Sequence, residues 1–222
     1  MSLGTSFSGL LLAAVMLAGL QDERPPVLAH PIELDHPPAA FVAVNQLLRE
    51  AKCVRADFAE EKKIKVLKRP LRSAGQIVFS GKLGLYRALK DPFVQELLVT
   101  PRGIAQRDET GKIEKLEIDK QPLAKGFIDA FLLVFSGDDK ALGADFELYF
   151  DGDQSAWTMG FVPKKKPLAK FIASMVVSGK QGTFESLLVN EVNGDKTTTK
   201  FSNVVTDKEL APEEQERWFG WR

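Results

Sequence analysis

The sequence predicts a single, strongly curved antiparallel β domain, and three observations support this fold class. Apolar residues recur at every second position through much of residues 54–205, which is the period of a half-buried strand. Short polar and glycine-containing segments divide this stretch into hairpins. Only a few short segments show helical spacing instead. Many adjacent antiparallel strands with few helices favour a strongly curved sheet or an incomplete barrel, a mainly β fold with helices.

The N-terminus resembles a secretory signal. Residues 9–20 are almost wholly apolar, and a polar, proline-containing segment follows. A dozen apolar residues are too few to span a bilayer, which needs roughly 20, but they match the apolar core of an export signal. Leu20 stands where a lipoprotein signal would carry its acylated cysteine, so lipid attachment there is excluded. We expect residues 1–20 to be a signal peptide, removed or kept as an anchor; the alternative is a buried helix.

A proline-rich segment and a helix precede the strands. Residues 21–38 contain five prolines and few large apolar groups, so we expect an extended tether outside the core. Residues 39–54 show helical spacing of apolar positions, which predicts a helix with one buried face. Cys53 is expected to be a small core residue on that helix. The apolar positions are Phe41, Val44, Leu47, Leu48 and Ala51.

The strands follow in order, separated by turn signals. Asp108-Glu109-Thr110-Gly111 predicts a hairpin, and so do Asp151-Gly152-Asp153, residues 178–182 and Asn193-Gly194. The clearest hairpin is the second, because aromatic and Met residues alternate with polar ones on both sides of it. The predicted strand segments are residues 54–67, 73–89, 93–100, 103–118, 145–163 and 171–205.

One further helix and a short amphipathic tail are predicted. Residues 122–136 place Leu123, Phe127, Phe131, Val134 and Phe135 along one stripe and end before a glycine, as helices often do. This helix is apolar around most of its circumference, so it is either deeply buried or covers something apolar. Residues 212–218 form a short amphipathic tail.

Composition argues against several classes of function. Lys and Arg together number 30, as do Asp and Glu, so no overall field attracts nucleic acid. The two histidines lie in the proline-rich segment, where nothing would orient them for catalysis. One cysteine forms no intrachain disulfide, and no His/Cys metal pattern is present. We therefore expect no enzyme, metal or cofactor; a hydrolase acting through carboxylates is the alternative.

Two basic runs have two interpretations. Residues 62–69 contain five basic residues, and Lys164-Lys165-Lys166 forms the second run. Lysines commonly protect strand edges from aggregation and solvate turns. The alternative is a surface attracted to anionic lipid headgroups or to an acidic partner.

Three stretches of the chain follow one another in a distinctive order. Residues 56–79 contain a Phe-x-Glu-x-Lys strand, beginning at Phe58, and a glycine-led strand after it. Residues 81–104 contain a series of strands with basic, aromatic and X-Pro positions, and residues 164–204 contain closing strands with Asn-Gly-Asp followed by threonines and Phe-x-Asn-Val. In this order of pieces, the chain from Phe41 to Val205 resembles the LolA family of periplasmic outer-membrane lipoprotein carriers. It departs from the family where Arg87-Ala88 stands in place of an expected Trp.

The resemblance implies a half-open barrel, formed by residues 39–222, with helices as a lid over an apolar cavity. The expected protein is a periplasmic monomer that carries a lipoprotein or another acylated lipid towards the outer membrane, between an inner-membrane donor and an outer-membrane acceptor. A family Arg latches the lid, and Lys82 is its nearest match. The residues expected to contact lipid are Phe58, Phe79, Leu85, Phe127, Phe131, Phe135, Phe150, Trp157, Met159, Phe161 and Met175.

The same aromatic and Met residues also fit a simpler interpretation. They could form a packed core with no space for a ligand, and the pattern alone favours that. The protein would then be a binding or scaffolding module of the cell envelope that recognises a protein partner.

Overall fold

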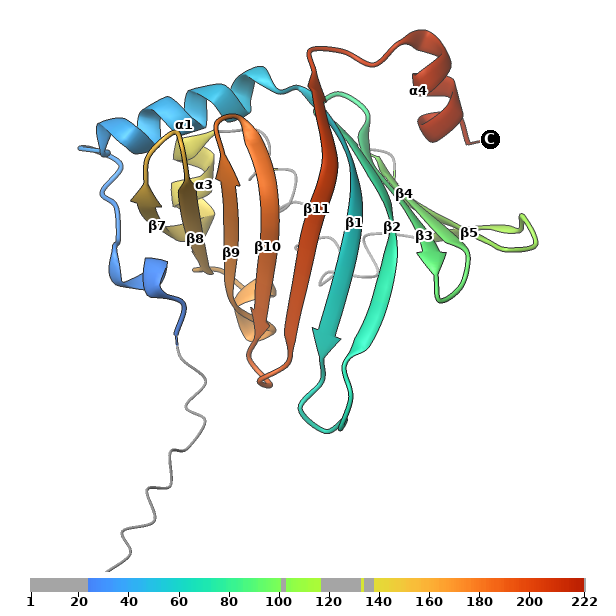
Figure 1. Ribbon diagram of the computed structural model, residues 1–222, viewed down its shortest axis with the longest axis horizontal. Coiled ribbons are helices and arrows are strands. Elements are labelled where there is room, and N and C mark those ends of the chain that lie inside the picture. The colour runs from blue at the N-terminus through green and yellow to red at the C-terminus, as the bar shows by residue number, and fades with distance from the viewer. Residues whose placement is uncertain (1–23, 101–102, 117–132, 134–137, 222) are drawn as a thin grey trace, which may run out of the picture.

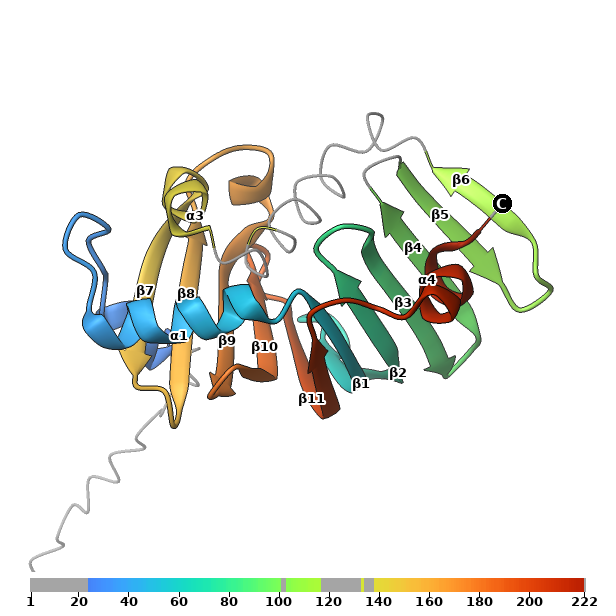
Figure 2. The ribbon, with the colours of Figure 1, turned by 90° about the horizontal axis from the view of Figure 1, so that it is seen from above.

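The computed structural model describes residues 24–100, 103–116, 133 and 138–221, and these contain one sheet of 11 antiparallel strands (Figure 1). Its order is β6-β5-β4-β3-β2-β1-β11-β10-β9-β8-β7, so the first and last strands pair in the middle. The sheet is curved and does not close (Figure 2), which confirms the predicted fold class. The strands are β1 (Cys53–Lys63), β2 (Leu71–Ser80), β3 (Gly84–Asp91), β4 (Gln95–Thr100), β5 (Gly103–Asp108), β6 (Ile113–Leu116), β7 (Phe146–Gly152), β8 (Trp157–Pro163), β9 (Ile172–Lys180), β10 (Thr183–Glu191) and β11 (Lys196–Asp207).

Each strand has two faces, because successive side chains point to opposite sides of a sheet. We call the face that carries Val54 and Phe79 the inner face, and the face that carries Cys53 and Val78 the outer face. Most large buried side chains belong to the inner face.

The helices are α1 (Ala39–Glu50), α3 (Asp139–Asp145) and α4 (Pro212–Phe219), with single 3-10 turns at η1 (Pro26–Ala29) and η3 (Leu168–Lys170).

Helix α1 lies across one end of β7–β10 (Figures 1 and 2). It buries Phe41, Val44 and Leu48, as its spacing predicted. These side chains belong to the apolar cluster on the inner face, which we call the inner cluster. The helix ends at Glu50, however, and Cys53 is the first residue of β1 rather than part of the helix. From Cys53 onward, burial follows the two-residue period of a strand, and pairing with β2 and β11 satisfies the backbone.

The proline-rich segment is packed against the sheet from residue 24 onward, which differs from the expected tether. Val27 and Leu28 are buried against Tyr149 and Val176 on the outer face. The backbone N–H of Ile32 donates to the carbonyl of Leu148 at 3.0 Å. Pro26 begins the 3-10 turn η1, where its fixed φ fits the first helical position, and the two buried apolar residues of this turn supply the packing.

The hairpins at residues 108–111, 151–153 and 193–194 occur where they were predicted. The segment 73–89 is divided between β2 and β3. Gly84 has φ 117°, and a Cβ there would lie 2.0 Å from the carbonyl oxygen of Val99. Only glycine fits this entry into β3. The predicted helix over 122–136 lies outside the described residues, apart from Leu133.

The C-terminal segment covers the outer face of β1–β4. Helix α4 confirms the predicted tail and buries Trp218 in one cluster with Val78, Tyr86 and Leu98. The Arg55 guanidinium donates to the carboxylates of Glu214 and Asp207. One arginine of β1 therefore joins the end of β11 to the start of α4.

A second polar group secures the same segment. The Tyr86 hydroxyl and the Arg107 guanidinium both donate to the carboxylate of Glu96, and the Arg107 guanidinium lies 4.6 Å from the centre of the Trp221 ring. The hydrogen bond from Arg107 holds the pKa of Glu96 below its ordinary value. Burial, followed by the bond to Glu96, raises the pKa of Tyr86.

Candidate functional site

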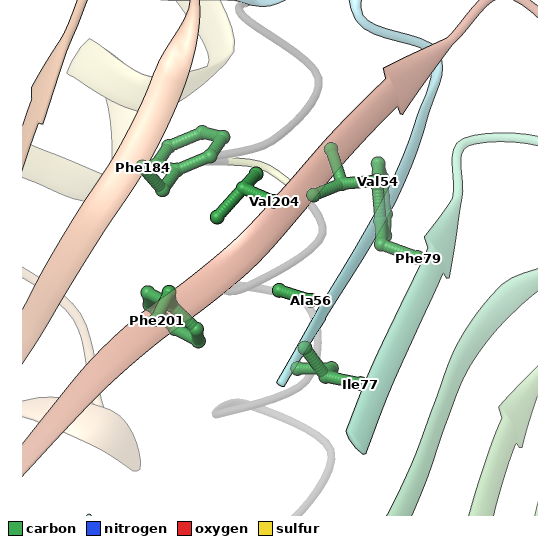
Figure 3. A pocket seen from close by; sticks show the side chains of 7 residues that line it. All are labelled: Val54, Ala56, Ile77, Phe79, Phe184, Phe201 and Val204. Atoms are coloured by element: carbon green, nitrogen blue, oxygen red, sulfur yellow. The ribbon is translucent and has the colours of Figure 1, made fainter. Parts of the chain in front are cut away.

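An apolar pocket lies on the inner face at the middle of the sheet, over the adjacent strands β2, β1, β11 and β10 (Figure 3). Every side chain that lines it is a hydrocarbon. Such a surface stabilises apolar groups by removing them from water and offers nothing for acid–base chemistry or metal binding. The lining residues are Val54, Ala56, Ile77, Phe79, Phe184, Phe201 and Val204.

A β-bulge places Val204 in this pocket. Arg55 pairs with Val205 and Asp57 with Ser202, so two residues of β11 lie opposite the single residue Ala56. Asn203 in the bulge has φ 51°, in the left-handed region that Asn adopts more readily than most residues. The extra residue reverses the alternation of β11. As a result both Phe201 and Val204 reach the pocket, while Val205 is exposed.

The pocket is nearly full. Its hollow measures ≈ 290 Å³ when the part open to solvent is counted, but only ≈ 10 Å³ admits water. That smaller volume is about what one water molecule requires. An acyl chain can therefore occupy this place only after the lining side chains have moved apart.

A charged pair lies further along β1 on the same face. The Arg87 guanidinium donates to Glu60 at 3.2 Å and lies 4.5 Å from the centre of the Phe58 ring. The hydroxyls of Ser73 and Thr199 donate to the same carboxylate at 3.3 and 3.2 Å. Both charged side chains are partly buried, so these bonds compensate for the lost hydration. The inner face thus changes from apolar to polar between the pocket and the β1–β2 turn.

The part of the sheet formed by β7–β9, which lies beneath α1 and which we call the wing, is packed differently from the pocket. Phe41 meets Phe150 edge to face with ring centres 5.6 Å apart, and Trp157 meets Phe184 in the same way at 5.8 Å. The Trp157 indole N–H donates to the carbonyl of Gln181 at 2.9 Å. A Cβ at Gly179 would lie 2.3 Å from the Trp157 ring, so the indole rests directly on the backbone of β9. Such contacts are typical of a fixed core.

The structure distributes the predicted lipid-binding residues over three places. Phe79 lines the pocket, and Leu85 belongs to the same inner cluster one strand away. Phe58 is buried beneath Arg87. The remaining predicted residues in the described part of the chain, all in the inner cluster of the wing, are Phe150, Trp157, Met159, Phe161 and Met175. Phe127, Phe131 and Phe135 lie outside the described residues.

Lys82, the predicted lid latch, lies in the exposed turn between β2 and β3. Its ammonium donates to Glu209 at 2.9 Å, and this bond raises the pKa of Lys82. The latch role stays a prediction. On β3 it is Arg87 that reaches the inner face, which the sequence reasoning did not select.

Of the seven residues that line the pocket, sequence reasoning selected only Phe79 as lipid-binding. It missed the other six, which are Val54, Ala56, Ile77, Phe184, Phe201 and Val204. Phe184 and Phe201 each stand in a short polar stretch, where a lone aromatic on a strand is the available signal. Val204 could not be found by alternation, because the bulge changes the face it occupies.

A second cavity of ≈ 350 Å³ lies on the outer face near η1, and apolar residues such as Leu28 and Val162 line it together with charged and polar ones. Ser174, Asn190 and Asp195 contribute to it, so it is poorly suited to a hydrocarbon chain.

Within residues 24–221, where described, no three His, Cys, Asp or Glu side chains are placed to hold a metal ion. None of the described helices combines the length and apolar character needed to cross a bilayer.

The family model described as "Outer membrane lipoprotein carrier protein LolA-like" matches residues 37–215. A search of curated proteins found no match.

Among solved structures, a LolA superfamily protein from Nitrosomonas europaea is similar at 7% identity and a TM-score of 0.45, with 80% of this chain and 97% of that chain covered. MucB in the Pseudomonas aeruginosa MucA/MucB complex is similar at 12% identity and a TM-score of 0.46, covering 80% and 60%. LprF from Mycobacterium bovis is similar at 8% identity and a TM-score of 0.31, covering 76% and 95%.

Proposed function

The chain belongs to the LolA-like outer membrane lipoprotein carrier family, and from this premise we propose that it binds the acyl chains of a lipoprotein or another lipid on its inner face. It acts as a carrier in the periplasm, moves its cargo towards the outer membrane, and catalyses no reaction. Members of this family are binding and carrier proteins of the cell envelope. The observation that carries the proposal is the all-hydrocarbon pocket at the centre of the sheet.

The polarity of the inner face suggests how cargo is oriented. The acyl chain lies over Val54, Ile77 and Phe201, and its polar end points towards Glu60 and Arg87. In that orientation the hydrocarbon displaces no charged group from its partner. The polar part of the cargo leaves the protein towards the β1–β2 turn.

The free energy gained by burying an acyl chain must be partly offset if the cargo is to be released. Burying a chain of about twelve methylenes releases roughly 10 kcal/mol at about 0.8 kcal/mol each. A carrier must also release its cargo, so much of this gain has to be offset. Contacts that the pocket side chains make with one another when empty, and lose on opening, provide that offset.

Val204 and Val205 provide a matched test. They are neighbours on β11, but Val204 lines the pocket and Val205 is exposed. We expect Val204→Asp to abolish binding of a fluorescent fatty acid, because it would place a carboxylate among hydrocarbons, while Val205→Asp binds as the parent does. Native mass spectrometry of protein purified from a bacterial periplasm without detergent should show an acylated ligand on the parent. Equal binding by both variants would contradict the proposal.

The small free volume also supports a second candidate. If the inner face is a permanently filled core, the protein is a non-catalytic envelope module that recognises a protein partner. That function predicts an apo mass from the periplasm and no uptake of added fatty acid. The two measurements above therefore separate the candidates.

A further inference from the structure

The exposed apolar residues are concentrated at one end of the sheet. The antiparallel register places the β1–β2, β3–β4, β8–β9 and β10–β11 connections at the end opposite α1 (Figure 1). We call this end, residues 64–71, 92–94, 164–171 and 192–195, the turn edge. Within the described part of the chain nine large apolar side chains are exposed, and seven of them lie here. They are Val66, Leu67, Leu71, Phe93, Val94, Phe171 and Val192.

The most exposed residues stand at the tip of the β1–β2 hairpin. Val66 is 87% exposed and Leu67 is 47% exposed. The turn is closed by the backbone N–H of Leu67, which donates to the carbonyl of Ile64 at 2.9 Å. The tip therefore has a defined conformation that holds two apolar side chains in solvent, a position with no benefit to the fold itself.

The same edge carries a net positive charge in a chain whose charges balance overall. Residues 62–72 include six basic and no acidic residues, and residues 164–170 include four basic and no acidic residues. Lys62 pairs with Glu191, Lys63 and Arg72 both pair with Glu61, and Lys165 pairs with Asp145. Across the ranges that the structure describes, no acidic partner is found for Lys68, Arg69 or Lys166. Two turns far apart in sequence thus present cations on one side of the molecule.

The turn edge combines exposed apolar side chains with basic ones, and this combination complements the interface of an anionic bilayer. Apolar side chains can enter the boundary between headgroups and acyl chains, while Lys and Arg reach the phosphates. An acidic protein partner would match the charge but would leave Val66 and Leu67 without an apolar environment. A second copy of this chain would bring like charges together. The combination of both features therefore favours lipid.

We propose that the turn edge docks the protein on an anionic lipid surface. The polar end of the inner face, with Glu60 and Arg87, lies towards the same end of the sheet. Docking would therefore bring the side from which cargo leaves close to the bilayer. This inference does not rest on acyl binding, and either proposal can fail alone.

The test is cosedimentation of the purified protein with vesicles that contain phosphatidylglycerol, compared with vesicles of phosphatidylcholine alone. The parent should sediment with the anionic vesicles. The Val66→Asp, Leu67→Asp double variant should bind at least about tenfold more weakly, because two apolar contacts are lost and two like charges are added. The matched control is Val42→Asp, Val205→Asp, which changes the two exposed valines outside the turn edge. This control should bind as the parent does.

A second pair of variants tests the charge. Lys68→Glu, Arg69→Glu should lower binding by more than about tenfold at low salt, while Lys52→Glu, Lys208→Glu, exposed at the α1 end, should not. Added salt should weaken binding of the parent. Circular dichroism checks that all variants are folded.

Three outcomes would overturn the inference: no sedimentation of the parent, equal binding by the tip variant and its control, or concentration-dependent self-association that the tip variant abolishes. The fluorescent fatty acid separates this result from the proposed function. The tip variant should bind the fatty acid normally, and Val204→Asp should still bind vesicles.

Discussion

Strands β1–β4 carry two different surfaces on opposite faces. On the inner face Val54, Ile77 and Phe79 surround a pocket that holds about one water and is open in part to solvent. On the outer face Trp218 seals the sheet, and two carboxylate–arginine groups secure α4 and the C-terminus. The outer side of these strands is thus covered by a helix, while the inner side borders a small hollow. For the proposed lipid binding, this difference means that the pocket side chains would move apart on one face while the covered outer face maintains the curvature of the sheet.

The largest expected effect comes from loosening the outer face. Trp218→Ala should lower the free energy of unfolding by about 3–5 kcal/mol, because it removes a buried indole and leaves a cavity. Urea denaturation measures this change. Val205→Ala, at an exposed site on β11, is the control and should stay within about 0.5 kcal/mol of the parent. A loss of less than about 1 kcal/mol for Trp218→Ala would remove the distinction between the faces.

A smaller effect is expected on the inner face. Phe201→Ala should cost only about 1–2 kcal/mol, since Phe201 is partly buried and already adjoins free space. The same urea experiment provides the value. If the loss equals that of Trp218→Ala, the pocket is as tightly packed as the outer face, and the second candidate function gains support.

Alkaline pH should act on the outer face through Tyr86. Its pKa is raised in the folded protein, so the folded state keeps a proton that the unfolded chain loses above about pH 10. Stability should therefore fall as the pH rises beyond that value. Tyr86→Phe should remove this part of the alkaline loss, as measured by thermal unfolding from pH 8 to 11. An unchanged alkaline slope would show that Tyr86 titrates normally.

Acid should have the smallest effect, through Glu96. Its pKa is lowered by the hydrogen bond from Arg107, so the contribution of Glu96 is complete above the ordinary pKa of about 4 and is lost as the pH falls through the lower folded value. Glu96→Gln should flatten the acid limb of the stability curve below about pH 4. Glu109→Gln, at an exposed turn position, should leave that limb as it is in the parent.

Much of this architecture could be predicted from the sequence, because alternation and turn residues are local signals. The hairpin at residues 151–153 and the buried stripe of α1 were expected, and so was the amphipathic character of the segment that forms α4. The end of α1 was misplaced because Cys53 fits both a helical and an alternating pattern. The seven-residue helix α3 was not expected, since it is shorter than two turns and its signal is the N-cap Asp138.

The pocket was predicted less well, because its position depends on pairing between distant strands. Phe79 was selected, but Phe184 and Phe201 reach the same place only because β10 and β11 return beside β1. Phe150 and Trp157 have the same composition signal as the pocket residues, yet Phe41 of α1 packs on Phe150, and Trp157 packs on Phe184 and the backbone at Gly179. Periodicity identifies the buried face of a strand, and only the tertiary arrangement shows whether a helix or a cavity lies above it.

The near absence of free space beside Ala56 and Phe201 has a consequence for rates. A ligand cannot enter a cavity that does not yet exist, so separation of the lining side chains must come first. At high lipid concentration the observed rate of uptake should then stop rising and reach the rate of that opening step. Stopped-flow fluorescence would show a plateau, and its height would report how often the empty protein opens.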